Sequence, residues 1–323
     1  MSKMLASIVG VLALFLGATV SSQTKADSDI RVTLLGTGTP IPNPDRFGPS
    51  TLVEAGDQKL LFDAGRGATI RLRQILVAKK AIMTKIDVLF LTHYHSDHTV
   101  GIPDLWLTGW LNNSRTEPFH VIGPVGAKSL MANLEGAYAP DIKIRIEDEK
   151  LPPDGVATVA EEFEKDGVVY SQDGVKVIAF TVDHGAAIKP AVGYRIEYRG
   201  RVVVISGDTR YSQNVIKYST DVDLLIHEVC AARPELLSSS PYMQRVMDHH
   251  TSPREAGLVF ALAKPKLAVF SHLVFLGSDK IPPPTVDDIV AGTRETYSGP
   301  LQVGEDLMSF EIGDTVTVRQ RNP

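Results

Sequence analysis

Residues 93–98 constrain this chain most, because they place three imidazoles and one carboxylate within six positions. An apolar run of Ile, Val, Leu and Phe leads directly into them. Side chains alternate between two faces in an extended chain, so we expect His93, His95 and Asp97 to point the same way. His98 then follows as the chain begins to turn. Imidazole nitrogen and carboxylate oxygen are ligands that zinc prefers, and two adjacent metal ions would account for so many ligands in so short a segment.

The composition is that of an ordinary globular protein. The chain has 323 residues, 43% of them hydrophobic and 22% charged, which is enough to bury a large core in one or two domains. Its formal net charge of −5 lacks the basic balance of a nucleic-acid binder, so we expect no nucleic-acid partner, although a local basic groove stays open. The only cysteine, Cys230, excludes an intrachain disulfide and a Cys-based zinc site.

Residues 1–26 have the pattern of a secretory signal peptide. Lys3 gives a positive start, an almost wholly apolar run extends from Met4 to Val20, and polar residues follow. This run is long for a signal peptide and short for a membrane span, so an uncleaved anchor is the alternative. Folded-domain patterning begins at Ile30. We therefore expect one folded domain at residues 30–323, exported to the periplasm or secreted, with membrane contact only if the leader is uncleaved.

A second pattern recurs along the chain: a short apolar strand ends, and a His or Asp stands just past it. It occurs at His93, His184, Asp208 and His272. In layered α/β folds, strand ends that share an edge of a sheet are where sites are built, so these positions can converge in space. The complete set of expected metal ligands is His93, His95, Asp97, His98, His184, Asp208 and His272.

Some neighbouring residues allow two interpretations. Asp63, at a strand end, either supports a ligand histidine or caps the following helix. Trp106 and Trp110 share one helical face, which is either core or the lining of an aromatic substrate pocket. The acidic residues 141–174 predict a solvated, hairpin-rich insertion. Three further histidines are interpreted as structural: His120, His227 and His249.

The ligand pattern resembles that of the metallo-β-lactamase superfamily, whose signature is His-x-His-x-Asp-His followed by a later His, a later Asp and a final His. The match runs from about Ile30 to the C-terminus. It implies an α/β fold, a four-layer αβ/βα sandwich with two sheets inside and helices outside. It also implies two Zn²⁺ ions, with Mn²⁺ or Fe as alternatives. One ion would be held by His93, His95 and His184, the other by Asp97, His98 and His272, with Asp208 and a hydroxide bridging them.

Within the superfamily the sequence is most similar to the ribonuclease Z-like branch. Asp208 as the bridge, in place of Cys, points away from the class B β-lactamases. His250-Thr251-Ser252 resembles that branch's His-Ser-Thr motif, and Glu228 resembles its strand-end Glu. Only 23 residues separate His184 from Asp208, where the branch's RNA-clamping arm would be inserted, and an exported protein would not meet precursor tRNA. Three segments resemble exported arylsulfatase-type members: residues 46–50, 62–67 and 107–110.

These resemblances imply a dinuclear zinc hydrolase that cleaves sulfate esters with a metal-activated hydroxide. The alternatives are a phosphodiesterase acting on small or cyclic phosphodiesters, a carboxylic ester or lactone hydrolase, and a metal-binding scaffold without catalysis. Asp97 would orient the nucleophile, and His250, supported by Glu228, would act as general acid toward the leaving oxygen. The expected partner is a small-molecule ester, and self-association as a homodimer stays open.

Overall fold

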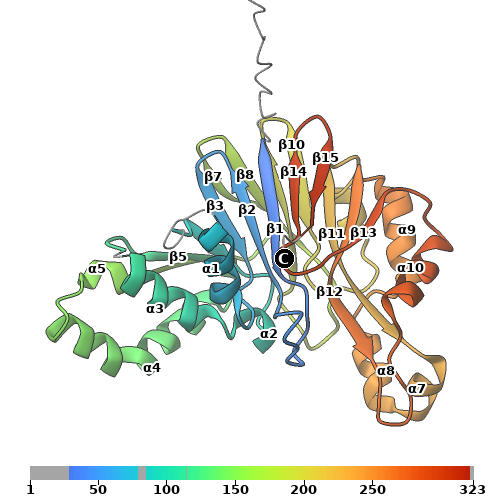
Figure 1. Ribbon diagram of the computed structural model, residues 1–323, viewed down its shortest axis with the longest axis horizontal. Coiled ribbons are helices and arrows are strands. Elements are labelled where there is room, and N and C mark those ends of the chain that lie inside the picture. The colour runs from blue at the N-terminus through green and yellow to red at the C-terminus, as the bar shows by residue number, and fades with distance from the viewer. Residues whose placement is uncertain (1–28, 79–84, 114, 321–323) are drawn as a thin grey trace, which may run out of the picture.

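The computed structural model describes residues 29–78, 85–113 and 115–320, and across them two mixed β-sheets pack face to face with helices on both outer faces (Figure 1). The predicted αβ/βα sandwich is therefore confirmed. The predicted leader, residues 1–26, lies outside the described residues. Among the helices that are described, none combines the length and apolar character that crossing a membrane requires.

The first sheet has eight strands in the order β15-β14-β1-β2-β3-β4-β5-β6. Strands β2 and β3 form a hairpin around Gly56, whose φ of +58° favours glycine. From β3 to β6 the strands run parallel. The strands of this sheet are β1 Ile30–Gly36, β2 Ser50–Ala55, β3 Gln58–Phe62, β4 Val88–Phe90, β5 Phe119–Pro124, β6 Thr158–Phe163, β14 Ser309–Ile312 and β15 Val316–Arg319.

The second sheet has seven strands in the order β13-β12-β11-β10-β9-β8-β7. Its strands β10 to β13 run parallel, and their near-continuous apolar sequences suit strands that are covered on both faces. The strands of this sheet are β7 Gly167–Gln172, β8 Val175–Thr181, β9 Val192–Tyr198, β10 Arg201–Ile205, β11 Leu224–Ala232, β12 Leu267–Leu276 and β13 Leu301–Val303.

Three apolar clusters hold the layers together. One fills the space between the sheets, one lies between the first sheet and α1, α3 and α4, and one lies between the second sheet and α6, α9 and α10. The helices are α1 Ala68–Ala78, α2 Ser96–Thr99, α3 Ile102–Asn113, α4 Ala127–Glu147, α5 Pro153–Val156, α6 Gln213–Tyr218, α7 Pro234–Ser239, α8 Pro241–Met247, α9 Pro253–Ala263 and α10 Val286–Arg294. Helix α9 begins with a capping box formed by Ser252 and Glu255.

The acidic segment 141–174 is not an insertion, so that prediction was wrong. Its first part completes α4, which extends to Glu147. Its second part supplies β6, the edge of the first sheet, and β7, the edge of the second. Most acidic side chains of the segment are exposed and stand on α4, α5 or β6 or in the turns beside them, which gives the segment the sequence pattern of a solvated loop.

The two tryptophans of α3 belong to the core. Trp106 and Trp110 are fully buried, and their indole N–H groups donate to the carbonyls of Val156 and Pro152 at 2.8 and 2.9 Å. Side chains with no exposed surface cannot line a substrate pocket. The core interpretation is confirmed, and the pocket interpretation is wrong.

Candidate metal centre

The loop between β4 and α2 carries the first ligand candidates. Strand β4 ends at Phe90, so His93 and His95 come from an extended loop and not from the strand itself. Asp97 and His98 lie on the short helix α2, which corrects the expectation that Asp97 alternates along an extended chain with the two histidines. The carbonyl of Thr92 accepts a hydrogen bond from the backbone N–H of Val192 at 3.0 Å, which ties this loop to the second sheet.

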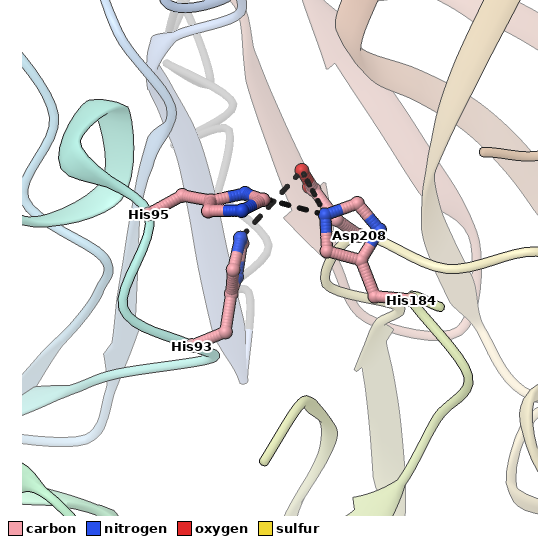
Figure 2. Close-up of side chains that lie close together, drawn as sticks. All are labelled: His93, His95, His184 and Asp208. Carbon is pink, nitrogen blue, oxygen red and sulfur yellow. Dashed lines mark hydrogen bonds and ion pairs between the residues drawn. The ribbon is translucent and has the colours of Figure 1, made fainter. Parts of the chain in front are cut away.

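Three ligand candidates stand three positions past the end of a strand. His93 follows Phe90 of β4, His184 follows Thr181 of β8, and Asp208 follows Ile205 of β10. Figure 2 shows the side chains of His93, His95, His184 and Asp208 pointing toward one another. The predicted convergence of strand ends is therefore present at one edge of the sandwich.

His272 reaches the site in another way. Strand β12 continues past it to Leu276, so the expectation that the strand ends at this histidine was wrong. The β11–β12 register shifts between His227 and Val229, and His272 has a φ of +48° at that irregularity. An extra residue in one strand bends it and redirects a side chain, and here it turns His272 toward Asp97 and Asp208.

Asp208 stands between two groups of ligand candidates. Its Oδ2 atom lies 3.9 Å from His93 Nε2 and 3.7 Å from His184 Nε2 on one side. On the other side it lies 3.3 Å from His98 Nε2 and 3.2 Å from His272 Nε2. Within each of the groups His93, His95, His184, Asp208 and Asp97, His98, His272, the potential ligand atoms all lie within 4.8 Å of one another. One carboxylate therefore touches both groups.

The buried ring nitrogens test whether a cation fits. His93 Nε2 and His98 Nε2 are buried without a hydrogen-bond partner, although both face the carboxylate of Asp208. A buried polar atom without a partner costs about 1–3 kcal/mol, so such atoms are rare in proteins. A cation between these nitrogens and the carboxylate would satisfy all three groups. The donor set of imidazoles and carboxylates fits zinc, and also manganese or iron.

Most ligand candidates are held in the form that binds metal, which is neutral imidazole or ionised carboxylate. Burial lowers the pKa of His93 well below its usual range and lowers that of His184 to about 4, so both rings are neutral. Burial on its own would raise the pKa of Asp208, but His272 and His98 hold that pKa well below its usual range. Burial on its own would also raise the pKa of Asp97, but the hydrogen bond from His272, together with the charges of His98 and His272, lowers it.

Asp63 supports a ligand candidate and does not cap α1. Its Oδ2 lies 2.7 Å from His98 Nδ1 and accepts from the hydroxyl of Thr92 at 2.8 Å, while its Oδ1 accepts from the Thr92 N–H at 2.8 Å. A carboxylate on Nδ1 fixes the tautomer that leaves Nε2 free for a metal. Asp63 adopts a φ of +58° at the end of β3, a conformation that Asp tolerates better than most residues.

His250 and Glu228 form a buried pair beside both groups. His250 Nδ1 lies 3.2 Å from Glu228 Oε2, and a ring nitrogen of His250 falls within 4.8 Å of ligand atoms of Asp208 and His272. Burial alone would lower the pKa of His250, but the Glu228 carboxylate outweighs it and raises the pKa to about 9. Glu228 Oε1 also accepts from the N–H of Thr251 at 2.9 Å. His250 is therefore a protonated donor at neutral pH.

Two supporting groups were missed at the level of sequence. The carbonyl of His249 accepts from His184 Nδ1 at 2.8 Å, and the Thr92 hydroxyl links Asp63 to the loop. A backbone carbonyl leaves no mark in a sequence, and a lone Thr before a His has no distinctive pattern. The structural roles predicted for two other histidines are confirmed: His120 pairs with Glu161 at 2.7 Å, and buried His227 bonds the carbonyl of Glu228 at 2.6 Å.

Known proteins share this fold and much of this sequence. Residues 58–273 match the Beta-lactamase superfamily domain. A protein named ribonuclease Z from Mycolicibacterium gilvum is 34% identical over 291 residues, which are 88% of this chain and 96% of that protein.

Solved structures agree on the fold. The short form of human tRNase Z superposes with a TM-score of 0.62 at 21% identity, covering 88% of this chain and 99% of that one. The metallo-β-lactamase fold protein YhfI from Bacillus subtilis gives a TM-score of 0.63 at 20% identity, covering 87% and 98%. With its two sheets, its His/Asp centre and these relatives, the chain belongs to the metallo-β-lactamase superfamily, in its ribonuclease Z-like branch.

Proposed function

We propose that this protein is a dinuclear metal-dependent phosphodiesterase that hydrolyses small or cyclic phosphodiesters. The observation that carries the proposal is the carboxylate of Asp208 between two groups of imidazoles, in a chain whose relatives are named ribonuclease Z. The prediction of sulfate ester cleavage has no support among the relatives reported above. A carboxylic ester or lactone substrate has none there either.

Most of these residues would bind the metal ions, and the others would assist the reaction. His93, His95 and His184 would hold one ion and Asp97, His98 and His272 the other, with Asp208 shared between them. Two bound divalent ions would supply Lewis acidity and lower the pKa of water at the site. Asp97 Oδ2, which lies 3.2 Å from His272 Nε2, would accept a hydrogen bond from the attacking water and orient it.

His250 is placed to protonate the leaving oxygen. It is nearly buried, charged at neutral pH and held by Glu228, so it can donate a proton without changing position. A 4-nitrophenolate leaving group needs little protonation, whereas an alkoxide needs a full proton. His250 should therefore matter more for alkyl diesters than for aryl diesters.

The chain between His184 and Asp208 supports a small substrate. Its 23 residues form a loop and the β9–β10 hairpin, which lies within the second sheet and pairs from Arg201–Tyr198 to Ile205–Tyr194. Within this described stretch nothing extends beyond the sheet that could clamp a folded RNA. A substrate of one or two nucleotide units fits this chain better than precursor tRNA does.

The test compares three 4-nitrophenyl esters and a lactone. Bis(4-nitrophenyl) phosphate, 4-nitrophenyl sulfate, 4-nitrophenyl acetate and a lactone are offered to protein loaded with Zn²⁺ or Mn²⁺, whose bound metal is measured by mass spectrometry. We expect about two ions per chain and a kcat/KM for the phosphodiester above that for the sulfate. Strong sulfatase activity with no diesterase activity would contradict the proposal.

A further inference from the structure

A groove of about 450 Å³ opens beside the metal centre and has no role in the chemistry described so far. It lies between the ends of the two sheets, with Pro124 and Phe163 contributed by the first sheet and Val182 and Val192 by the second. Pockets that bind small molecules typically have about 300–1,000 Å³ and mostly apolar linings. The groove is therefore large enough for one nucleoside.

The walls of the groove are bonded to the loops that carry ligand candidates. The N–H of Val192 donates to the carbonyl of Thr92, the residue before His93, and the N–H of Val182 donates to the carbonyl of Ala191 at 3.0 Å. The hydroxyl of Tyr94, between His93 and His95, donates to the carbonyl of Pro124. The groove thus adjoins the side of the centre formed by the loop after β4.

The groove and the surface around His250 are separate. The pocket beside His250 is lined by Arg210, Tyr211, Met247 and Glu255, and none of these residues lines the groove. If His250 protonates the leaving oxygen, the groove is free to hold the substituent that stays on phosphorus. This division assigns the groove to the retained part of the substrate.

The side chains that line the groove favour a ligand with a planar ring and an anionic group beside it. Val125 is 48% exposed there next to the partly buried ring of Phe163 and to Pro190, which gives apolar surface for a planar base. Lys165 and Lys189 stand exposed at the groove, and within the described part of the chain neither forms an ion pair.

The groove also contains two carboxylates. That of Asp166 is engaged, because its Oδ1 accepts from both the N–H and the hydroxyl of Thr181 at 2.7 Å. Glu164 is exposed and sits in the turn between β6 and β7. Within the described residues neither carboxylate pairs with Lys165 or Lys189, so both ammonium groups can approach an anionic group such as a second phosphate.

We propose that this groove binds the retained nucleoside of a phosphodiester substrate, with its base against Val125, Phe163 and Pro190 and a second phosphate near Lys165 and Lys189. The inference rests on the proposed phosphodiesterase function. In the reaction, water attacks phosphorus, the bond from phosphorus to the leaving oxygen breaks, and the nucleotide monoester stays in the groove with one proton released. The substrate class is a small nucleotide diester that carries a second phosphate.

A series of three diesters that all release 4-nitrophenolate tests whether the groove binds the nucleoside. The series consists of methyl 4-nitrophenyl phosphate, thymidine 5′-(4-nitrophenyl phosphate), and the same thymidine diester with a 3′-phosphate. We expect kcat/KM to rise about tenfold when the nucleoside is added, as base stacking allows. The 3′-phosphate should add about fivefold, and this second gain should shrink as salt screens the lysines.

Variants assign each gain to its part of the groove. Lys165→Ala/Lys189→Ala should abolish the gain from the 3′-phosphate alone, whereas Lys143→Ala/Lys280→Ala, which removes the same charge from exposed positions outside the groove, should keep it. Val125→Gln should reduce the gain from the nucleoside, and Val159→Gln, at a similarly exposed position on β6, should not. Equal kcat/KM values for the three diesters would overturn the inference. Equal losses of kcat/KM in the groove and control variants would overturn it as well.

Binding separates this inference from the proposed function. Thymidine 3′,5′-bisphosphate is titrated calorimetrically into the metal-loaded protein and the two lysine variants. If no diester is hydrolysed, the proposed function fails, and the calorimetry alone then decides for or against the groove. Binding that weakens in Lys165→Ala/Lys189→Ala but not in the control supports the groove, and equal binding in all three proteins rejects it.

Discussion

One oxygen atom, Oδ2 of Asp208, lies within 4 Å of ring nitrogens from four histidines that come from three separate segments of the chain. No other carboxylate within the described residues touches both groups of ligand candidates. Asp208 is also almost fully buried, with 3% of its surface exposed. At the scale of single residues, Asp208 Oδ2 is the atom that both groups of ligand candidates share.

Replacing Asp208 should therefore affect both groups together. We expect Asp208→Ala to reduce bound metal from about two ions to one or fewer and to lower kcat/KM by at least about 10³-fold, because the shared carboxylate is lost. Metal content is measured by mass spectrometry after dialysis. His250→Gln serves as the comparison, since it should keep both ions. A metal content unchanged in Asp208→Ala would show that the carboxylate is not shared.

Asp63→Asn tests the support of His98. Asn tolerates the left-handed backbone at this position, so the change removes charge and leaves the fold in place. We expect metal affinity to fall about 10- to 100-fold, the usual effect of losing a carboxylate behind a ligand histidine. Asp87→Asn is the control, because Asp87 accepts a backbone N–H from Lys59 in the same sheet, away from the ligands. Equal affinities in both variants would contradict the supporting role.

The pair of His250 and Glu228 should control the alkaline limb of the pH profile. The pKa of His250 is raised, so its protonated form persists at neutral pH and is lost as pH rises through about 9. Glu228→Gln removes the carboxylate that raises this pKa, so the alkaline limb should move to lower pH. His250→Gln should slow a methyl alkyl diester more than a 4-nitrophenyl diester. If both diesters slow equally, His250 is not the acid.

At the scale of elements, a buried ion pair fastens the loop after β1 to the body of the protein. Arg71 on α1 lies 2.9 Å from Asp306, and both side chains are almost fully buried. Asp306 also accepts from the N–H and hydroxyl of Thr37 and from the N–H of Phe47. The carbonyl of Thr37 in turn accepts from Leu273, the residue after His272. The pair therefore helps to hold the bulge that aims His272.

Breaking the pair of Arg71 and Asp306 should lower the free energy of unfolding more than breaking an exposed ion pair does. Asp306→Asn leaves the Arg71 charge buried and unpaired, so we expect the free energy of unfolding to fall by about 3–5 kcal/mol. Arg31→Met removes a more exposed pair with Glu311 in the same sheet and should change it by less than about 1 kcal/mol. Urea unfolding measures both values. Similar losses in the two variants would reject the role given to Arg71 and Asp306.

The sequence predicted ligand candidates correctly where the pattern lies within one short segment. Apolar strands followed by His or Asp identified His93, His184 and Asp208, because strand ends in such folds meet at one edge. The bulge at His272 depends on the register between β11 and β12, which a single strand does not reveal. Strand β6 was missed because it carries two charged residues, Glu161 and Glu162, and none of its side chains is fully buried, which resembles a loop.

At the scale of the whole molecule, we propose that the protein is exported, because residues 1–26 have the pattern of a signal peptide. We expect the mature chain to begin between Ala18 and Asp27 when the gene is expressed with its leader in a Gram-negative host. Intact-mass spectrometry of the periplasmic fraction measures this. A chain that keeps Met1 and sediments with membranes would instead indicate an uncleaved anchor.

Strand β1 pairs with β2 on one side and with β14 on the other, so Arg31 lies beside Glu311, 280 positions along the chain. Such distant pairing makes folding slow, because the entropy of closing a very long loop is lost before the contact forms. The first sheet cannot be completed on the ribosome until the last strands have been synthesised. Under the export proposed above, this delay would leave the nascent chain unfolded while it crosses the membrane.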